Sequence, residues 1–250
     1  MNVVFMIDIQ NDERSKNTPY KLSQEVWKAW IEDKPDTELF VLNEPLFDDP
    51  NIRPNFYKMY FPQLMEATGQ EWDKCLYVDS DTIPSPDLPN IFDVVGDKFG
   101  VVRNFGSCEW VVRSILNWRN NLFPEEPILN YSKYFNSGMM VFSKHHTEFF
   151  EKAQECFTEN FAKIMGLVRL GCGIDQTMLN FLTRKHNVDM MWLPYEYNMQ
   201  DLYRREALNE NMPYLDMGYI FHFNAIPNNG DNSKTMYWME TTFNKLYAKN

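Results

Sequence analysis

The chain has 250 residues, of which 44% are hydrophobic and 24% are charged, so it can bury a sizeable core and is not an intrinsically disordered protein. Its formal net charge of −11 disfavours general binding to the phosphate backbone of a nucleic acid, and we expect no nucleic-acid partner. The charge does not exclude a small anionic ligand, which needs only a locally positive pocket.

The apolar runs are short, and none of them could cross a bilayer as a helix. The N-terminus has neither the basic start nor the apolar length of a signal peptide. These two features predict a soluble, cytoplasmic protein without a transmembrane segment. The four cysteines show no C-x-x-C spacing, which favours reduced thiols over a zinc site. Frequent asparagine and scarce alanine are typical of an AT-rich coding genome, such as that of a virus or phage.

Continuous apolar runs alternate with segments whose apolar residues recur at helical spacing, which is typical of an α/β architecture. Strands are expected at residues 3–7, 39–42, 74–78, 99–103, 136–142, 188–193 and 219–223, the first two of them buried. Helices are expected at residues 23–31, at 56–67 with a break at Pro62, after an N-cap at Thr147, at 175–183, and in the tail from 235. Residues 228–232 should form a loop. No linker interrupts the pattern, so we expect a single domain over residues 1–250, with 235–250 as a docked C-terminal helix.

Two carboxylates, Asp79 and Asp81, directly follow the strand expected at residues 74–78. In a continued strand they would point to one face, and in a turn they can converge on one hard cation. Ligands of open α/β sheets collect outside the carboxyl ends of the strands, which is where this pair lies. The alternative is a solvated acidic turn. The apolar run before the pair favours a metal site.

Two polar pairs also stand at the ends of expected elements. Asn136 and Ser137 open an apolar strand, and the following Gly138 allows another backbone to approach closely. Asp175 and Gln176 open a helix after a glycine-rich turn. The alternatives are a bulge at the strand start and simple N-terminal capping of the helix.

His222 lies inside an apolar strand near the end of the chain. A lone histidine in such a strand is more often a hydrogen-bonded core residue than a ligand. Beside a D-x-D pair that preference shifts, because imidazole can complete a Mn²⁺ site.

The order of these blocks resembles glycosyltransferase family eight, a GT-A-fold family that includes glycogenin and bacterial galactosyl- and glucosyltransferases. The matching blocks are residues 76–81 for the strand and D-x-D, 135–138 for F-N-[SA]-G, 175–180 for D-Q-x-x-L-N, 193–198 for L-P-x-x-Y-N, and His222 for the closing histidine. Two positions depart from the family pattern. Lys58 stands where the family has an arginine, and Lys234 and Trp238 follow His222 at a longer spacing than the family's G-x-x-K-P-W, without its Pro-Trp pair.

The resemblance implies an α/β GT-A fold, with a single Rossmann-like mixed sheet flanked by helices. It implies a hexosyltransferase that moves a sugar from a nucleotide-sugar donor, a UDP-sugar first of all, to a glycan or other hydroxyl acceptor, with retention of anomeric configuration. The variable loops of residues 106–127 would hold the acceptor. The implied metal ligands, for Mn²⁺ or Mg²⁺, are Asp79, Asp81 and His222. The implied catalytic residues are Asp175 and Gln176, and the implied substrate-binding residues are Asp8, Lys58, Ser80, Asn136, Ser137 and Lys234.

Three alternatives remain at this point. One is a degenerate GT-A domain that binds nucleotide or glycan without transfer. Another is an isochorismatase-like hydrolase, which would use Asp8 after the first strand but lacks the Cys-Val pattern of that family. The third is a haloacid-dehalogenase-like phosphatase, which would need threonine or valine where the chain has Ile83.

Overall fold

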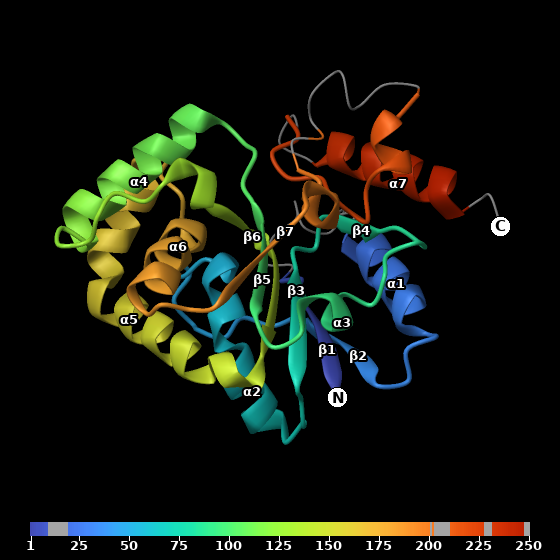
Figure 1. The fold of residues 1–250 in the computed structure, drawn as a ribbon, viewed down its shortest axis with the longest axis horizontal. Helices are drawn as coiled ribbons and strands as arrows, with labels where there is room; N and C mark the ends of the chain where they lie inside the picture. Colours follow the sequence, from blue (N-terminus) through green and yellow to red (C-terminus); the bar gives the residue numbers. More distant parts are fainter. Residues whose placement is uncertain (10–19, 201, 203–210, 228–231, 248–250) are drawn as a thin grey trace.

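The computed structural model describes residues 1–9, 20–200, 202, 211–227 and 232–247 (Figure 1). Within these residues a six-stranded sheet has the strand order β2-β1-β3-β6-β5-β7. Its strands are β1 (Asn2–Ile7), β2 (Thr37–Leu42), β3 (Lys74–Val78), β5 (Phe99–Arg103), β6 (Phe135–Ser143) and β7 (Met190–Leu193). β1 pairs in parallel with β2 and β3, β6 runs antiparallel to β3 and β5, and β5 is parallel to β7. The expected mixed α/β sheet is confirmed.

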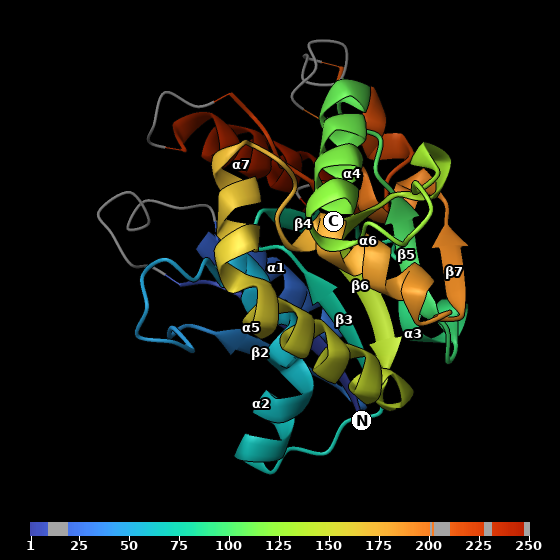
Figure 2. The same cartoon turned by 90° about the vertical axis from the view of Figure 1, so that its left-hand side faces the viewer.

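Helices cover both faces of this sheet (Figures 1 and 2). One face carries α1 (Tyr20–Ile31) and α3 (Ile91–Val95), and the other carries α2 (Phe61–Thr68), α4 (Cys108–Leu122), α5 (Thr147–Arg169) and α6 (Asp175–Lys185). Successive side chains of a strand point to opposite faces, so Phe5 and Tyr77 join the core under α2 and α5. Their neighbours Val4 and Leu76 pack against α1 and α3.

A second, two-stranded sheet lies beside the carboxyl end of β3. It consists of β4 (Thr82–Pro84) and β8 (Ile220–His222), paired antiparallel with Thr82 opposite His222. The strand expected at residues 219–223 therefore belongs to this sheet and not to the large one. Strand β4 was not expected, because three residues that end in proline carry no readable period.

Helix α7 (Ser233–Tyr247) forms the tail and packs on the small sheet, where the Tyr247 hydroxyl donates to the Pro84 carbonyl at 2.8 Å. Short 3-10 helices connect the other elements: η2 (Pro54–Tyr60), η3 (Tyr131–Lys133), η4 (Lys144–His146), η5 (Tyr195–Asn198) and η6 (Pro213–Asp216). The helical segment expected at 56–67 is thus split into η2 and α2, with Pro62 in the first turn of α2. Most of the loop expected at residues 228–232 lies outside the described residues.

Three local expectations were wrong. The segment 106–127, expected as loops, contains the four-turn helix α4, whose N-cap Ser107 accepts a hydrogen bond from the Trp110 amide at 3.3 Å. Thr147 is the first residue of α5 and not its N-cap, and its hydroxyl donates to the Lys144 carbonyl at 2.8 Å. Strand β2 is only half-buried, because it forms the edge of the sheet.

None of the helices in the described residues is long and apolar enough to span a bilayer.

Candidate functional site

The turn after β3 is held in place by hydrogen bonds from three neighbouring elements. The Asp79 amide donates to the Gly138 carbonyl on β6 at 2.8 Å. The Thr82 hydroxyl donates to the Asp79 carbonyl at 2.8 Å, and it accepts from the Trp27 indole of α1 at 3.0 Å. The backbone between Asp79 and Thr82 therefore has one fixed path, which presents the carboxylates of both aspartates at the carboxyl end of the sheet.

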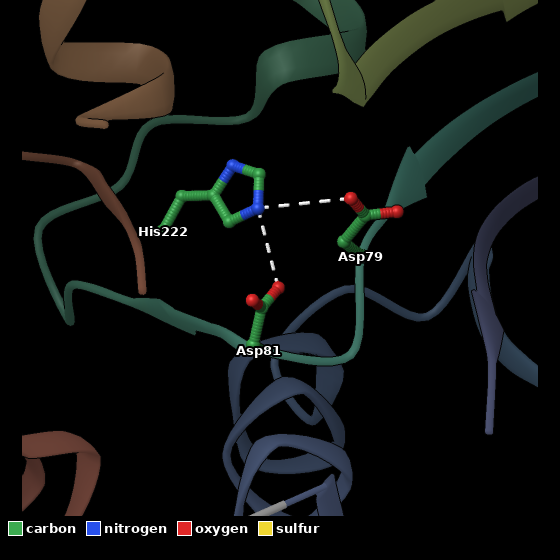
Figure 3. Close-up of side chains that lie close together, drawn as sticks. All are labelled: Asp79, Asp81 and His222. Atoms are coloured by element: carbon green, nitrogen blue, oxygen red, sulfur yellow. Dashed lines mark ion pairs between the residues drawn. The ribbon is translucent and has the colours of Figure 1, made fainter. Parts of the chain in front are cut away.

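Asp79, Asp81 and His222 come together at this turn (Figure 3). His222 Nε2 lies 3.2 Å from Asp81 Oδ1 and 3.6 Å from Asp79 Oδ2. The pairing of Thr82 with His222 across the small sheet places the imidazole opposite the aspartates. One ligand atom from each side chain falls within 4.8 Å of the others. The two carboxylates and one imidazole are donors that suit a hard or borderline divalent cation.

A hydrogen bond to Asn198 fixes the orientation of the His222 ring. Its Nδ1 lies 3.0 Å from Asn198 Oδ1, and the Asn198 amide nitrogen donates to Asn136 Oδ1 at 3.0 Å. Because Asn198 Oδ1 can only accept, Nδ1 carries the proton and the lone pair of a neutral ring is on Nε2. Nε2 is buried without a hydrogen-bond partner. An orphaned ring nitrogen that faces two carboxylates fits a metal site.

The pKa shifts of His222 and Asp79 also agree with a cation site. Burial lowers the pKa of His222, but Asp81 and Asp79 outweigh this effect and raise it above its ordinary value. Burial raises the pKa of Asp79, but Lys58, His222 and the Tyr77 hydroxyl lower it below its ordinary value. The Asp79 carboxylate thus stays ionised and attracts positive charge to the space between it, Asp81 and His222.

A second ion pair lies directly behind this cluster. The Lys58 ammonium is 1% exposed and lies 2.9 Å from Asp175 Oδ2 and 3.6 Å from Asp79 Oδ1. It also donates to the Ser137 carbonyl at 3.0 Å, and the Ser137 hydroxyl donates to Asp175 Oδ2 at 2.7 Å. Burial alone would lower the pKa of Lys58, but Asp175 and Asp79 raise it above its ordinary value, so the lysine is charged.

Gly138 permits the close approach of β6 to both aspartate and histidine. A methyl group at this position would overlap the His222 ring and the Asp79 carboxylate. Any residue other than glycine at position 138 would therefore displace the His222 ring or the Asp79 carboxylate.

A network of amides continues from the cluster towards α6. The Ser137 amide donates to Gln176 Oε1 at 3.2 Å. Asn136 Nδ2 and Gln176 Nε2 each lie 3.5 Å from Asn104 Oδ1, just beyond the end of β5. Asn104 was not predicted as a site residue. Its position directly after a buried strand was the available signal.

An open cleft of about 270 Å³ lies in front of the aspartates, between β1, α1 and η2. Its lining includes Ile7, Ile9, Tyr20, Asn55 and Ser80 together with Asp79 and Asp81. Burial and the charges of Asp81, Asp8 and Asp79 raise the pKa of Tyr20, so its hydroxyl keeps its proton. Tyr20 was not predicted, because a single tyrosine before a helix carries no pattern.

Two of the sequence-predicted residues lie apart from these contacts. Asp8 is buried beside the cleft, where the Gln24 amide donates to its Oδ2 at 2.5 Å. Lys234 is exposed in the first turn of α7, and none of the contacts given above involves it. The structure brings together the remaining predicted residues, which are Lys58, Asp79, Ser80, Asp81, Asn136, Ser137, Asp175, Gln176 and His222.

With this geometry in view, the sequence matches the family model of glycosyl transferase family 8 over residues 3–234. The match covers most of the chain, so the protein belongs to this family and is a glycosyltransferase. A search among curated proteins finds no matching sequence.

Solved glycosyltransferases share the fold. A glycosyltransferase involved in the glycosylation of the major capsid of PBCV-1 has a TM-score of 0.59 at 11% identity, over 95% of this chain and 98% of that one. The galactosyltransferase LgtC, solved with donor and acceptor sugar analogs, has a TM-score of 0.56 at 14% identity, over 99% of this chain and 96% of LgtC. The bifunctional glycosyltransferase WbbM has a TM-score of 0.53 at 16% identity; 98% of this chain aligns with 49% of WbbM. These likenesses confirm the expected GT-A fold.

Proposed function

We propose that the protein transfers a hexose from a nucleoside diphosphate sugar, a UDP-sugar first of all, to a hydroxyl of a glycan, with retention and with a divalent cation. The observation that carries this proposal is the convergence of Asp79, Asp81 and His222 beside an open cleft in a family 8 glycosyltransferase. The sugar analogs bound to LgtC agree with a sugar-nucleotide donor and a glycan acceptor.

The proposed cation is Mn²⁺ or Mg²⁺, held by Asp79, Asp81 and His222, and it would supply the positive charge that offsets the charge on a departing diphosphate. Such a site also explains how a chain with a net charge of −11 can bind a dianionic donor. Asn198 contributes by fixing the ring nitrogen that faces the aspartates.

Lys58 has a positioning role in this proposal. Its ammonium donates to the Ser137 carbonyl and forms ion pairs with Asp175 and Asp79. It neutralises the buried Asp175 carboxylate and the partly exposed Asp79 carboxylate and keeps them in place, so we do not assign it a direct bond to the donor phosphates.

Asp175 and the amides beside it would orient the sugar. Lys58 and Ser137 occupy Oδ2 of Asp175, and among the described residues Oδ1 has no partner, which leaves this oxygen for a substrate. Gln176, Asn136 and Asn104 add amide groups on the same side. Fixed donors and acceptors of this kind hold the anomeric carbon in line for transfer.

The family match leaves the two hydrolase alternatives without support, since Asp8 and the Asp79–Asp81 turn belong to a glycosyltransferase fold. A degenerate domain would bind a nucleotide sugar without turning it over, and the sequence departures at Lys58 and Lys234 are the features that favour it.

Thermal-shift measurements test the proposal. UDP, GDP, CDP and their sugars would be added with and without Mn²⁺ to the wild type, to Asp81→Ala, and to the control Asp87→Ala, which removes an exposed carboxylate from the next turn. A ligand that binds only the folded state raises its apparent stability. We expect a Mn²⁺-dependent shift with one nucleotide, lost in Asp81→Ala and kept in Asp87→Ala. The absence of a shift with every nucleotide would contradict the proposal.

A further inference from the structure

A second groove, of about 490 Å³, lies between the C-terminal half of α5 and the loop that leads into η2. Figure 2 shows this half of α5 rising beside the blue loop that follows β2. The helix changes direction at Asn160, whose backbone is not helical, and the groove begins with the next residue, Phe161. The groove is separate from the metal cluster, and none of its lining residues has a role in the site described above.

Two arginines line this groove from opposite elements. Arg53 precedes η2, and Arg169 ends α5. Both side chains are exposed, and neither has an ion pair with any of the described residues. In a chain with a net charge of −11, two unpaired guanidinium groups that face one groove make it locally positive. Guanidinium groups are the preferred partners of phosphate and carboxylate oxygens.

The remaining wall of the groove is apolar. Pro50, Phe161, Met165 and Val168 line it, and Phe161 and Met165 also pack with their inner sides on the main core. Asn51 is the uncharged polar residue of the lining, and its amide nitrogens already donate to Asp49. A sugar ring would need partners for several hydroxyl groups and would find few here. An apolar chain needs none.

Consecutive residues of the chain line this groove and the cleft in front of the aspartates. Arg53 lines the groove, and the next two residues, Pro54 and Asn55, line the cleft in front of Asp79 and Asp81. A ligand whose anionic end is bound by Arg53 would therefore lie one short loop away from the proposed donor.

From this combination we infer that the groove binds a phosphate that carries an apolar chain, and that this amphiphile is the anchor of the glycan acceptor. The phosphate lies between Arg53 and Arg169, and the chain lies against Phe161, Met165 and Val168. The assignment of the amphiphile as acceptor rests on the proposed function, whereas the binding site itself does not.

Octyl phosphate below its micelle concentration is the probe. Its affinity would be measured by calorimetry, without metal or nucleotide, for the wild type, Arg53→Gln and Arg169→Gln. The control is Lys163→Gln, which removes one charge from the same half of α5 but does not line the groove. Methyl-labelled methionine, with the Met165 signal assigned through Met165→Leu, would report the position of the chain by NMR. All three charge variants change exposed side chains, so folding is not at risk.

We expect saturable binding of octyl phosphate, a shift of the Met165 methyl signal, and a loss of affinity of about 10-fold in each arginine variant but not in Lys163→Gln. Octyl glucoside and inorganic phosphate should each bind at least about 10-fold more weakly than octyl phosphate. Equal affinity in Arg53→Gln, Arg169→Gln and wild type, or an unmoved Met165 signal, would overturn the inference. If nucleotides shift the melting temperature while octyl phosphate does not bind, the inference fails and the proposed function stands. If octyl phosphate binds while no nucleotide shifts the melting temperature, the binding site stands and the proposed function fails.

Discussion

Lys58 and Asp175 form a buried ion pair, with Nζ 2.9 Å from Oδ2 and exposed fractions of 1% and 6%. The pair joins η2 to the first residue of α6, and through Asp79 it reaches the end of β3. The residues proposed for the cation and those proposed for the sugar thus share one lysine, whose charge both sets depend on.

Replacing Lys58 should lower the stability of the protein strongly. Lys58→Met leaves the buried Asp175 carboxylate beside an apolar side chain, and removal of one partner of a buried pair lowers the free energy of unfolding by about 3–5 kcal/mol. Urea unfolding would measure the loss. The matched control is Lys98→Met, which breaks an exposed Lys98–Asp189 pair of 3.5 Å and should cost no more than about 1 kcal/mol. Similar losses in the two variants would contradict a buried, charged Lys58.

Gly138→Ala tests the close approach of β6 to the cluster. The added methyl group overlaps the His222 ring and the Asp79 carboxylate, so one of them must move. We expect Mn²⁺ affinity, measured by electron paramagnetic resonance, to fall by about 10-fold or more, as when the support of a ligand is lost. In the control Gly166→Ala, on α5, nothing lies within 4 Å of the new methyl group. That variant should keep its Mn²⁺ affinity and gain up to about 1 kcal/mol of stability.

Asp175→Asn separates a role in turnover from a role in binding. The amide keeps the shape of the side chain and the hydrogen bond from Ser137, but it removes the negative charge and with it the ion pair to Lys58. If Asp175 stabilises positive charge at the anomeric centre, kcat should fall by about 100-fold or more while donor affinity changes little. Steady-state kinetics together with calorimetric donor binding would measure both quantities. An equal loss in both would exclude this role.

His146 predicts a pH dependence of stability outside the site. Burial is the main cause that lowers the pKa of His146 below its ordinary value, and Nδ1 accepts from the Ser143 amide at 3.1 Å. The folded state therefore favours the neutral ring. This contribution is present above the unfolded pKa of about 6.5 and is lost as the pH falls below it, because the unfolded chain then binds the proton more readily.

Urea unfolding at pH 7 and pH 5 would show the effect. His146→Gln keeps an acceptor at the third position of the capping box but cannot take up a proton, so its stability should fall less between the two pH values. The neighbouring variant His145→Gln changes an exposed side chain and should follow the wild type. The same pH dependence in all three proteins would show that His146 does not contribute.

The sequence predicted the parts of the site that follow long, regular elements. Asp79 and Asp81 could be placed because β3 is a continuous buried run, and Asp175 because α6 begins after a glycine-rich turn. The pairing of β4 with β8 could not be predicted, since three-residue strands carry no period and their partner lies far along the chain. The contact of Lys58 with Asp175 and the position of Tyr20 in the cleft also could not be predicted, because they join residues that lie far apart in the sequence. The segment that contains α4 was expected as a loop from the family resemblance, although its buried residues Val111, Ile115 and Trp118 recur at helical spacing.

The account rests on a cation held by Asp79, Asp81 and His222 and used on a sugar nucleotide. Hydrolysis of the UDP-sugar found by thermal shift, followed with and without Mn²⁺ in the wild type, Asp81→Asn and the control Asp87→Asn, tests this most directly. We predict that the wild type and Asp87→Asn release UDP slowly and only with Mn²⁺, and that Asp81→Asn loses this activity by about 100-fold or more. UDP release that persists in chelator, or that is unchanged in Asp81→Asn, would contradict the account.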